Sequence, residues 1–125
     1  MKRYLVLLLA LTARVAAAQG VVGTWSTQFD TQIGQQKYVF AFKQDGAALA
    51  ATAKAELAGQ PRDVVFKDVQ TKGDTVTFTE AFEFQGNAVP ITYTGIVSGD
   101  EIRFERKVAD FATESFVAKR QKERG

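Results

Sequence analysis

The chain has 125 residues, enough for one domain, and its hydrophobic content of 46%, with ten Phe, is sufficient for a packed core. It contains no His and no Cys, which excludes His-based catalytic triads, histidine or thiolate metal sites, and disulfide bonds. Its glycines occur singly, so no glycine-rich phosphate loop is present. We therefore expect no metal and no cofactor.

Residues 1–18 are predicted to be a secretory signal peptide. Lys2 and Arg3 precede an apolar run over 4–11, and three alanines at 16–18 predict cleavage before Gln19. The run is too short to span a bilayer, and no second one follows. Removing Lys2, Arg3 and Arg14 leaves 13 basic against 14 acidic residues, so the excess of positive charge belongs to the leader. We expect a single exported domain over 19–125, periplasmic or extracellular, with no membrane anchor and no nucleic-acid partner.

Period-two alternation of apolar and polar residues predicts β-strands through the rest of the chain. The segment 47–57 is rich in alanine, which favours a helix, but its polar residues at 52, 54 and 56 follow period two. The segment 63–69 changes parity, which predicts a bulge near Asp68. The expected strands are 23–29, 36–44, 47–57, 63–69, 75–84, 89–97, 102–108 and 116–120.

Two charged residues fall on apolar strand faces. Glu80 shares its parity with Val76, Phe78, Phe82 and Phe84. Arg106 shares its parity with the apolar residues at 102, 104 and 108. A buried unpaired charge costs several kcal/mol (order of magnitude), so each of these groups needs a partner. We predict that Glu80 and Arg106 form an interior ion pair.

Eight short strands joined by tight turns, with no helix long enough for a parallel crossover, predict an all-β fold. An antiparallel meander of this kind can remove its own edges by closing. We therefore predict an eight-stranded up-and-down barrel.

The start of the first strand carries a short motif. Gly23-Thr24-Trp25 resembles the Gly-x-Trp that opens lipocalin and related calycin barrels, in which an arginine late in the chain packs across the tryptophan. Arg120 is the matching residue here. The resemblance implies a barrel over 19–120, similar to the short secreted bacterial lipocalin-like domains. The chain is shorter than a typical lipocalin and lacks its C-terminal helix.

The inward parity of several strands predicts an aromatic interior with a few polar groups. Eight strands enclose a space that side chains fill or that holds one small ligand, and the alanines of 47–57 favour a hollow. This pattern is typical of a pocket for a small hydrophobic molecule with a polar or anionic head. The predicted ligand-binding residues are Tyr38, Phe40, Phe42, Phe78, Glu80, Phe82, Tyr93, Phe104 and Arg106.

Three functions fit this interior. The first is a carrier for a small hydrophobic ligand, with Arg106 meeting an anionic head. The second is a cofactor-free lipocalin-like enzyme, a cyclase, isomerase or lyase, with Glu80 as base or acid and with Tyr93 and Arg106 stabilising charge. The third is a structural or interaction protein whose barrel is filled.

Overall fold

The structure is a computed structural model and describes residues 20–122. The predicted signal peptide, 1–18, lies outside these residues. The described chain contains nine strands and no helix. They are β1 (Gly23–Thr31), β2 (Gly34–Asp45), β3 (Ala48–Leu57), β4 (Gln60–Val65), β5 (Lys67–Lys72), β6 (Thr75–Phe84), β7 (Asn87–Ser98), β8 (Glu101–Val108) and β9 (Ala112–Arg120).

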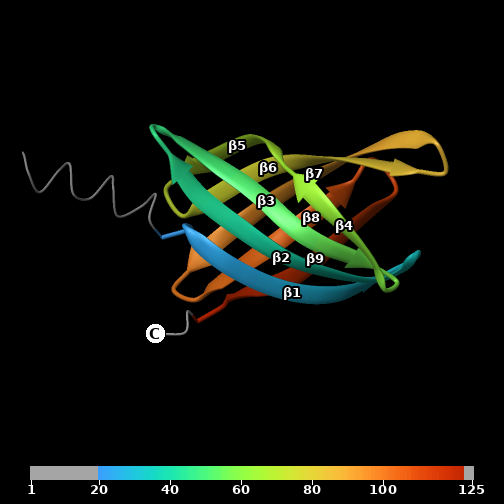
Figure 1. The fold of residues 1–125 in the computed structure, drawn as a ribbon, viewed down its shortest axis with the longest axis horizontal. Coiled ribbons are helices and arrows are strands. Elements are labelled where there is room, and N and C mark those ends of the chain that lie inside the picture. Colours follow the sequence, from blue (N-terminus) through green and yellow to red (C-terminus); the bar gives the residue numbers. More distant parts are fainter. Residues whose placement is uncertain (1–19, 123–125) are drawn as a thin grey trace, which may run out of the picture.

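All nine strands belong to one antiparallel sheet in the order β4-β3-β2-β1-β9-β8-β7-β6-β5. Strands that are neighbours in this order are also consecutive in the chain, with one exception. The first strand, β1, pairs with the last, β9. The sheet curls on itself into a barrel-like shape (Figure 1). The predicted all-β antiparallel meander is confirmed.

The alanine-rich segment is a strand, as predicted. In β3 the small side chains of Ala51, Ala53 and Ala55 are buried directly opposite Phe42, Phe40 and Tyr38 of β2. The alternation therefore serves packing, because three small residues leave room on the inner face for three large rings.

The predicted count of eight strands is wrong, because the expected fourth strand divides at Phe66 into β4 and β5. The predicted bulge is confirmed: Asp68 has a φ of 55°, and the register of β5 against β6 shifts between Lys67 and Gln70. β4 pairs with β3 and β5 pairs with β6, so these two consecutive strands form the edges of the sheet. Between β4 and β5, the amide of Phe66 donates a hydrogen bond to the carbonyl oxygen of Ala51 in β3 (3.1 Å).

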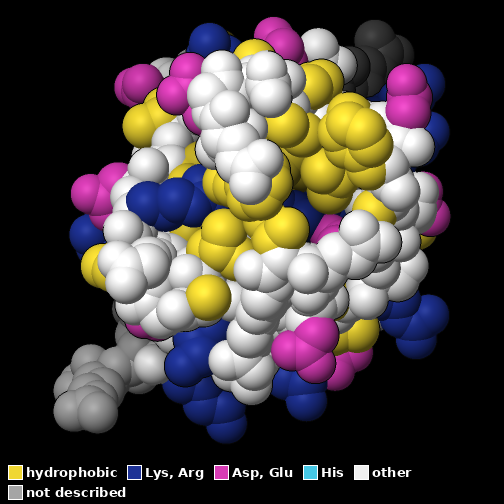
Figure 2. Space-filling model, turned by 90° about the vertical axis from the view of Figure 1, so that its right-hand side faces the viewer, with side chains coloured by type: hydrophobic (Ala, Val, Ile, Leu, Met, Phe, Trp, Pro, Cys, Tyr) yellow, Lys and Arg dark blue, Asp and Glu magenta, His cyan; other side chains and the backbone are white. Residues whose placement is uncertain are grey.

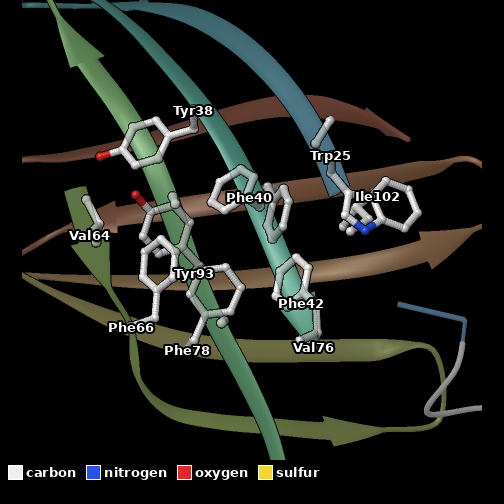
Figure 3. Close-up of a cluster of buried hydrophobic side chains, with 14 of the residues drawn as sticks. Trp25, Tyr38, Phe40, Phe42, Val64, Phe66, Val76, Phe78, Tyr93 and Ile102 are labelled. Carbon is white, nitrogen blue, oxygen red and sulfur yellow. The ribbon is translucent and has the colours of Figure 1, made fainter. Parts of the chain in front are cut away.

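Aromatic rings fill much of the interior (Figure 3). The ring centroids of Phe40 and Phe104 lie 5.2 Å apart, and those of Phe66 and Phe78 lie 4.6 Å apart. Gly95 faces Phe104 in the β7–β8 register, and a Cβ at this position would lie 2.6 Å from its ring. The glycine therefore makes room for the phenylalanine, and this part of the interior is a packed core.

Trp25 and Arg120 lie together, as predicted. Trp25 is fully buried, and the Arg120 guanidinium lies 4.2 Å from the centre of its ring. The same guanidinium donates to the carbonyl oxygens of Gly20 (2.7 Å) and Val22 (2.8 Å). A Cβ on Gly23 would lie 2.8 Å from Arg120 Nη1. The glycine of the Gly-x-Trp motif thus leaves space for the arginine.

Candidate functional site

Six polar side chains meet inside the sheet, each from a different strand. Two are carboxylates, two are guanidiniums and two are tyrosine hydroxyls. Because alternate residues of a strand point to the same face, each of them faces inward with its buried apolar neighbours. They are Tyr38 (β2), Arg62 (β4), Glu80 (β6), Tyr93 (β7), Arg106 (β8) and Glu114 (β9). We call them the polar cluster.

Glu80 is the acceptor at the centre of the polar cluster. Its side chain is fully buried, and it receives hydrogen bonds from Tyr93 (2.6 Å), Tyr38 (3.0 Å) and Arg62 Nη1 (2.8 Å). The Arg62 guanidinium also lies 4.8 Å from the ring centre of Phe82. A buried carboxylate is stable only with such partners. Arg62 and Glu80 therefore join β4 to β6, two strands that are not neighbours in the sheet.

The predicted direct pair of Glu80 with Arg106 is wrong, although both side chains are buried as predicted. Arg106 forms its ion pair with Glu114, which lies opposite it in the β8–β9 register. Its Nε donates to the hydroxyl of Tyr93 (2.9 Å), the residue opposite it on β7. The Tyr93 hydroxyl thus stands between the two charges and joins them through hydrogen bonds.

The sequence prediction missed Arg62 and Glu114 because it began the fourth strand at 63 and the last one at 116. β4 begins at Gln60 and β9 at Ala112. The signal was available: Arg62 shares its parity with Val64 and Phe66, and Glu114 shares its parity with Phe116. Extending each alternation by one step would have placed both side chains inside.

The polar cluster is electrically balanced. Burial raises the pKa of Tyr38, and the charge of Glu80 raises it further. Burial also raises the pKa of Tyr93 well above its ordinary value, and the neighbouring Tyr38 and Glu80 add to this effect. Burial alone would lower the pKa of Arg106, but Tyr93, Tyr38 and Glu114 outweigh it and raise the pKa. Both tyrosines are neutral at pH 7, and two carboxylates balance two guanidiniums.

A cavity of about 290 Å³ opens at the end of the molecule where β1–β2, β6–β7 and β8–β9 turn. Hydrophobic side chains gather on this end (Figure 2). Three of them are exposed at its rim, Ile33 (41%), Phe84 (37%) and Phe111 (76%). The full lining is Thr31, Gln32, Ile33, Gln36, Phe82, Phe84, Val89, Ile91, Arg106, Val108, Phe111, Ala112 and Glu114. We call it the end cavity.

The predicted ligand-binding residues fall into three groups. Phe82 and Arg106 line the end cavity. Tyr38, Glu80 and Tyr93 belong to the polar cluster, whose Arg106–Glu114 pair forms part of the cavity wall. The other four are buried among the rings of the packed core: Phe40, Phe42, Phe78 and Phe104.

Gln36 is a cavity residue that the prediction did not include. It lies on β2 with the inward parity of Tyr38, is 2% exposed, and lines the end cavity. Within residues 20–122 its Oε1 atom has no hydrogen-bond partner. A buried carbonyl oxygen is normally paired, so Gln36 is an exception among the buried polar groups of the described chain.

A wider depression of about 810 Å³ runs along β1 to β4. Its lining includes the exposed side chains of Lys37, Lys54 and Asp63. Lys54 and Asp63 form an ion pair whose side chains are 85% and 81% exposed, so water screens it strongly. This surface lacks the apolar enclosure of the end cavity, which we therefore regard as the candidate site.

Two further observations bear on the type of site. No group of three or more acidic residues within 20–122 is arranged to hold a metal ion. No helix in the described part of the chain is long and apolar enough to cross a membrane. Comparison of the chain with family models, curated proteins and solved structures finds no match.

Proposed function

We propose that the protein is an exported carrier, periplasmic or extracellular, which holds a small hydrophobic molecule with a polar or anionic head in the end cavity. The observation that carries this proposal is the combination of an exposed apolar rim with a buried, charged inner wall. Phe84 and Phe111 stand in solvent at the mouth, while Arg106 is 2% exposed at the inner wall. A cavity with an apolar rim and a charged inner wall orients a molecule that has one apolar and one polar end.

The exposed aromatic rim of the end cavity also supports a binding role. Large aromatic side chains gathered at one place on a surface mark a binding site more often than isolated ones do. Phe82 and Phe84 stack here with centroids 6.4 Å apart. Their rings face a cavity whose volume is close to the lower limit of ligand pockets, about 300 Å³. A ligand body the size of a short alkyl chain or a pair of rings fits this space.

We further propose that the sheet acts as a lipocalin-like barrel. Its edge strands β4 and β5 follow each other directly, and Arg62 and Glu80 join β4 to β6 by an ion pair of 2.8 Å. Side chains thereby cover the region where backbone pairing stops. Gly23, Trp25 and Arg120 pack at the opposite end from the rim residues, which supports a barrel with one closed end and one open end.

An enzyme that uses Glu80, Tyr93 and Arg106 has less support. The three groups are joined through the Tyr93 hydroxyl, but only Arg106 lines the end cavity. The Glu80 carboxylate is fully buried, accepts hydrogen bonds from Tyr93, Tyr38 and Arg62, and does not line the end cavity, so a substrate held there does not contact it. A filled structural barrel explains the packed core but leaves the apolar rim without a role.

The proposal is tested with N-phenyl-1-naphthylamine, a small uncharged dye whose fluorescence rises in apolar surroundings. Ala112 lines the cavity, and Ala112→Phe should fill it and abolish the fluorescence increase. Ala81→Phe is the matched control, because Ala81 is exposed on β6 and does not line the cavity. Absence of dye binding to the unmodified protein, or equal binding by both variants, would contradict the proposal.

A further inference from the structure

We infer that the end of the molecule around the end cavity docks on a phospholipid surface without net charge, through the hairpin turns that surround the cavity mouth. This inference concerns the outside of the rim and does not depend on a ligand inside the cavity. Three observations lead to it. Large hydrophobic side chains stand at these turns, the turns carry almost no charge, and hydrogen bonds hold the side chains outward.

The three exposed hydrophobic side chains at the cavity rim come from different hairpins. Ile33 lies in the β1–β2 turn, Phe84 is the last residue of β6, and Phe111 lies in the β8–β9 turn. Hydrophobic side chains gather at this end of the molecule (Figure 2), and such a patch on a surface marks an interaction site. Because these residues stand at turns and not on a flat strand face, they suit insertion between lipid head groups.

The turns at this end carry a single charged residue. Four hairpins turn here (Figure 1), and within residues 31–34, 57–60, 84–87 and 108–112 only Asp110 is charged. The turns at the opposite end, 45–48, 72–75 and 98–101, carry five charged residues: Asp45, Lys72, Asp74, Asp100 and Glu101. Charged side chains resist entry into a lipid interface, so the cavity end is the one that can approach it closely. The one charge there is negative, which favours lipid without net charge over anionic lipid.

Hydrogen bonds within the turns hold two of the hydrophobic residues in place. The amide of Phe111 donates to the carbonyl oxygen of Val108 (2.9 Å), and the amide of Ile33 donates to the hydroxyl of Thr31 (3.3 Å). The same hydroxyl donates to the carbonyl oxygen of Gly34 (2.7 Å). Ile33 and Phe111 are therefore presented outward before any surface is bound, and docking requires little ordering of the chain.

The exposed area favours lipid over a second copy of this chain. Ile33, Phe84 and Phe111 are 41%, 37% and 76% exposed, which gives roughly 300 Å² of apolar surface if a large side chain offers about 200 Å². Each partner of a stable protein pair buries about 800 Å². The turn residues beside them include the exposed amides of Gln32 and Gln85. A lipid interface accommodates apolar side chains and neutral amides together, whereas two copies placed end to end would set one open cavity against another.

The inference is tested by sedimentation of the protein with phosphatidylcholine vesicles at neutral pH. The unmodified protein should sediment with the vesicles, and Phe111→Ser should weaken this binding about tenfold, because it removes the most exposed aromatic side chain. Val65→Ser is the matched control, because Val65 is 73% exposed at the end of β4 away from the cavity mouth. It should leave vesicle binding unchanged. Vesicles made of equal amounts of phosphatidylcholine and phosphatidylglycerol should bind more weakly, and Asp110→Asn should narrow this difference.

The melting temperature separates lost binding from lost structure. Phe111 is exposed, so Phe111→Ser should melt at the temperature of the unmodified protein. Absence of vesicle binding, an equal loss in Val65→Ser, or tighter binding to the mixed vesicles would overturn the inference. A dimer that forms without lipid in sedimentation velocity and that Phe111→Ser dissociates would also overturn it, because a second copy would then cover the turns.

Ala112→Phe separates this inference from the carrier proposal. It should lose the binding of N-phenyl-1-naphthylamine, measured without vesicles, and keep vesicle binding, because it fills the cavity and leaves Ile33, Phe84 and Phe111 in place. If the unmodified protein binds the dye but not the vesicles, only this inference falls. If it binds the vesicles but not the dye, only the carrier proposal falls. If it binds neither, both fall.

Discussion

Replacement of Arg62 by Met should destabilise the protein far more than its position near a strand end suggests. Arg62 is the cation paired with Glu80, whose side chain is fully buried, while the Arg62 side chain itself is 26% exposed. Breaking a buried ion pair costs about 3–5 kcal/mol, because it strands the remaining charge. Tyr38 and Tyr93 would still donate to Glu80. We therefore expect the lower end of the range, about 3 kcal/mol.

The assay is urea unfolding followed by tryptophan fluorescence, with free energies taken from linear extrapolation. Lys54→Met is the matched control, because it breaks an ion pair in the neighbouring strand whose side chains are 85% and 81% exposed. It should change stability by less than about 1 kcal/mol. The double variant Arg62→Met/Glu80→Gln should regain at least half of the loss. Equal effects of Arg62→Met and Lys54→Met would refute the assignment of Glu80 as a buried, paired carboxylate.

Three further predictions concern the packed interior and the tyrosines. Trp25→Ala should cost about 3–5 kcal/mol, because Trp25 is fully buried under Arg120. Trp25 is the single tryptophan of the chain, so urea unfolding of this variant is followed by far-UV circular dichroism, and a loss near zero would leave the Gly-x-Trp motif without a structural role. Gly95→Ala should cost about 1–3 kcal/mol, because its Cβ would overlap the Phe104 ring. Gly86→Ala is the control: the space around Gly86 is open, so that substitution tests only the strain of a positive φ. In protein that begins at Gln19 the only tyrosines are Tyr38 and Tyr93, both with a raised pKa, so the folded protein should show less tyrosinate absorbance at pH 10 than the unfolded chain. Their contribution to stability is complete below the unfolded pKa of about 10 and is lost as the pH rises from there through the raised pKa of the folded state. Equal tyrosinate absorbance of folded and unfolded protein at pH 10 would contradict their burial.

Alternation alone predicted most of the strands because one face of each is buried; β5, in which no residue is fully buried, is the exception. In the alanine-rich segment 48–57 the polar residues keep period two, and this outweighed helix propensity. The same parity placed Glu80 and Arg106 in the interior correctly. It could not identify their partners, because a partner is set by register between strands that are distant in sequence.

The shape of the interior could not be predicted from the sequence, for a different reason. Parity distinguishes inside from outside but does not give the position of a side chain along the length of the molecule. Phe78 and Phe84 have the same parity in β6, yet Phe78 is 1% exposed in the core and Phe84 is 37% exposed at the rim. The division of the fourth strand likewise depends on the backbone at Phe66 and on the φ of Asp68, which the alternation only hints at.

The most direct test of the carrier role is native mass spectrometry of the protein purified from its own host without detergent. We predict a second species heavier by the mass of one small molecule, which organic extraction releases and which is absent from Ala112→Phe, because Ala112 lines the end cavity. Extraction and fragmentation would then identify the released molecule and the chemistry of its head group. Protein that is found at its bare mass, and that also fails to bind N-phenyl-1-naphthylamine, would contradict a binding role for this cavity.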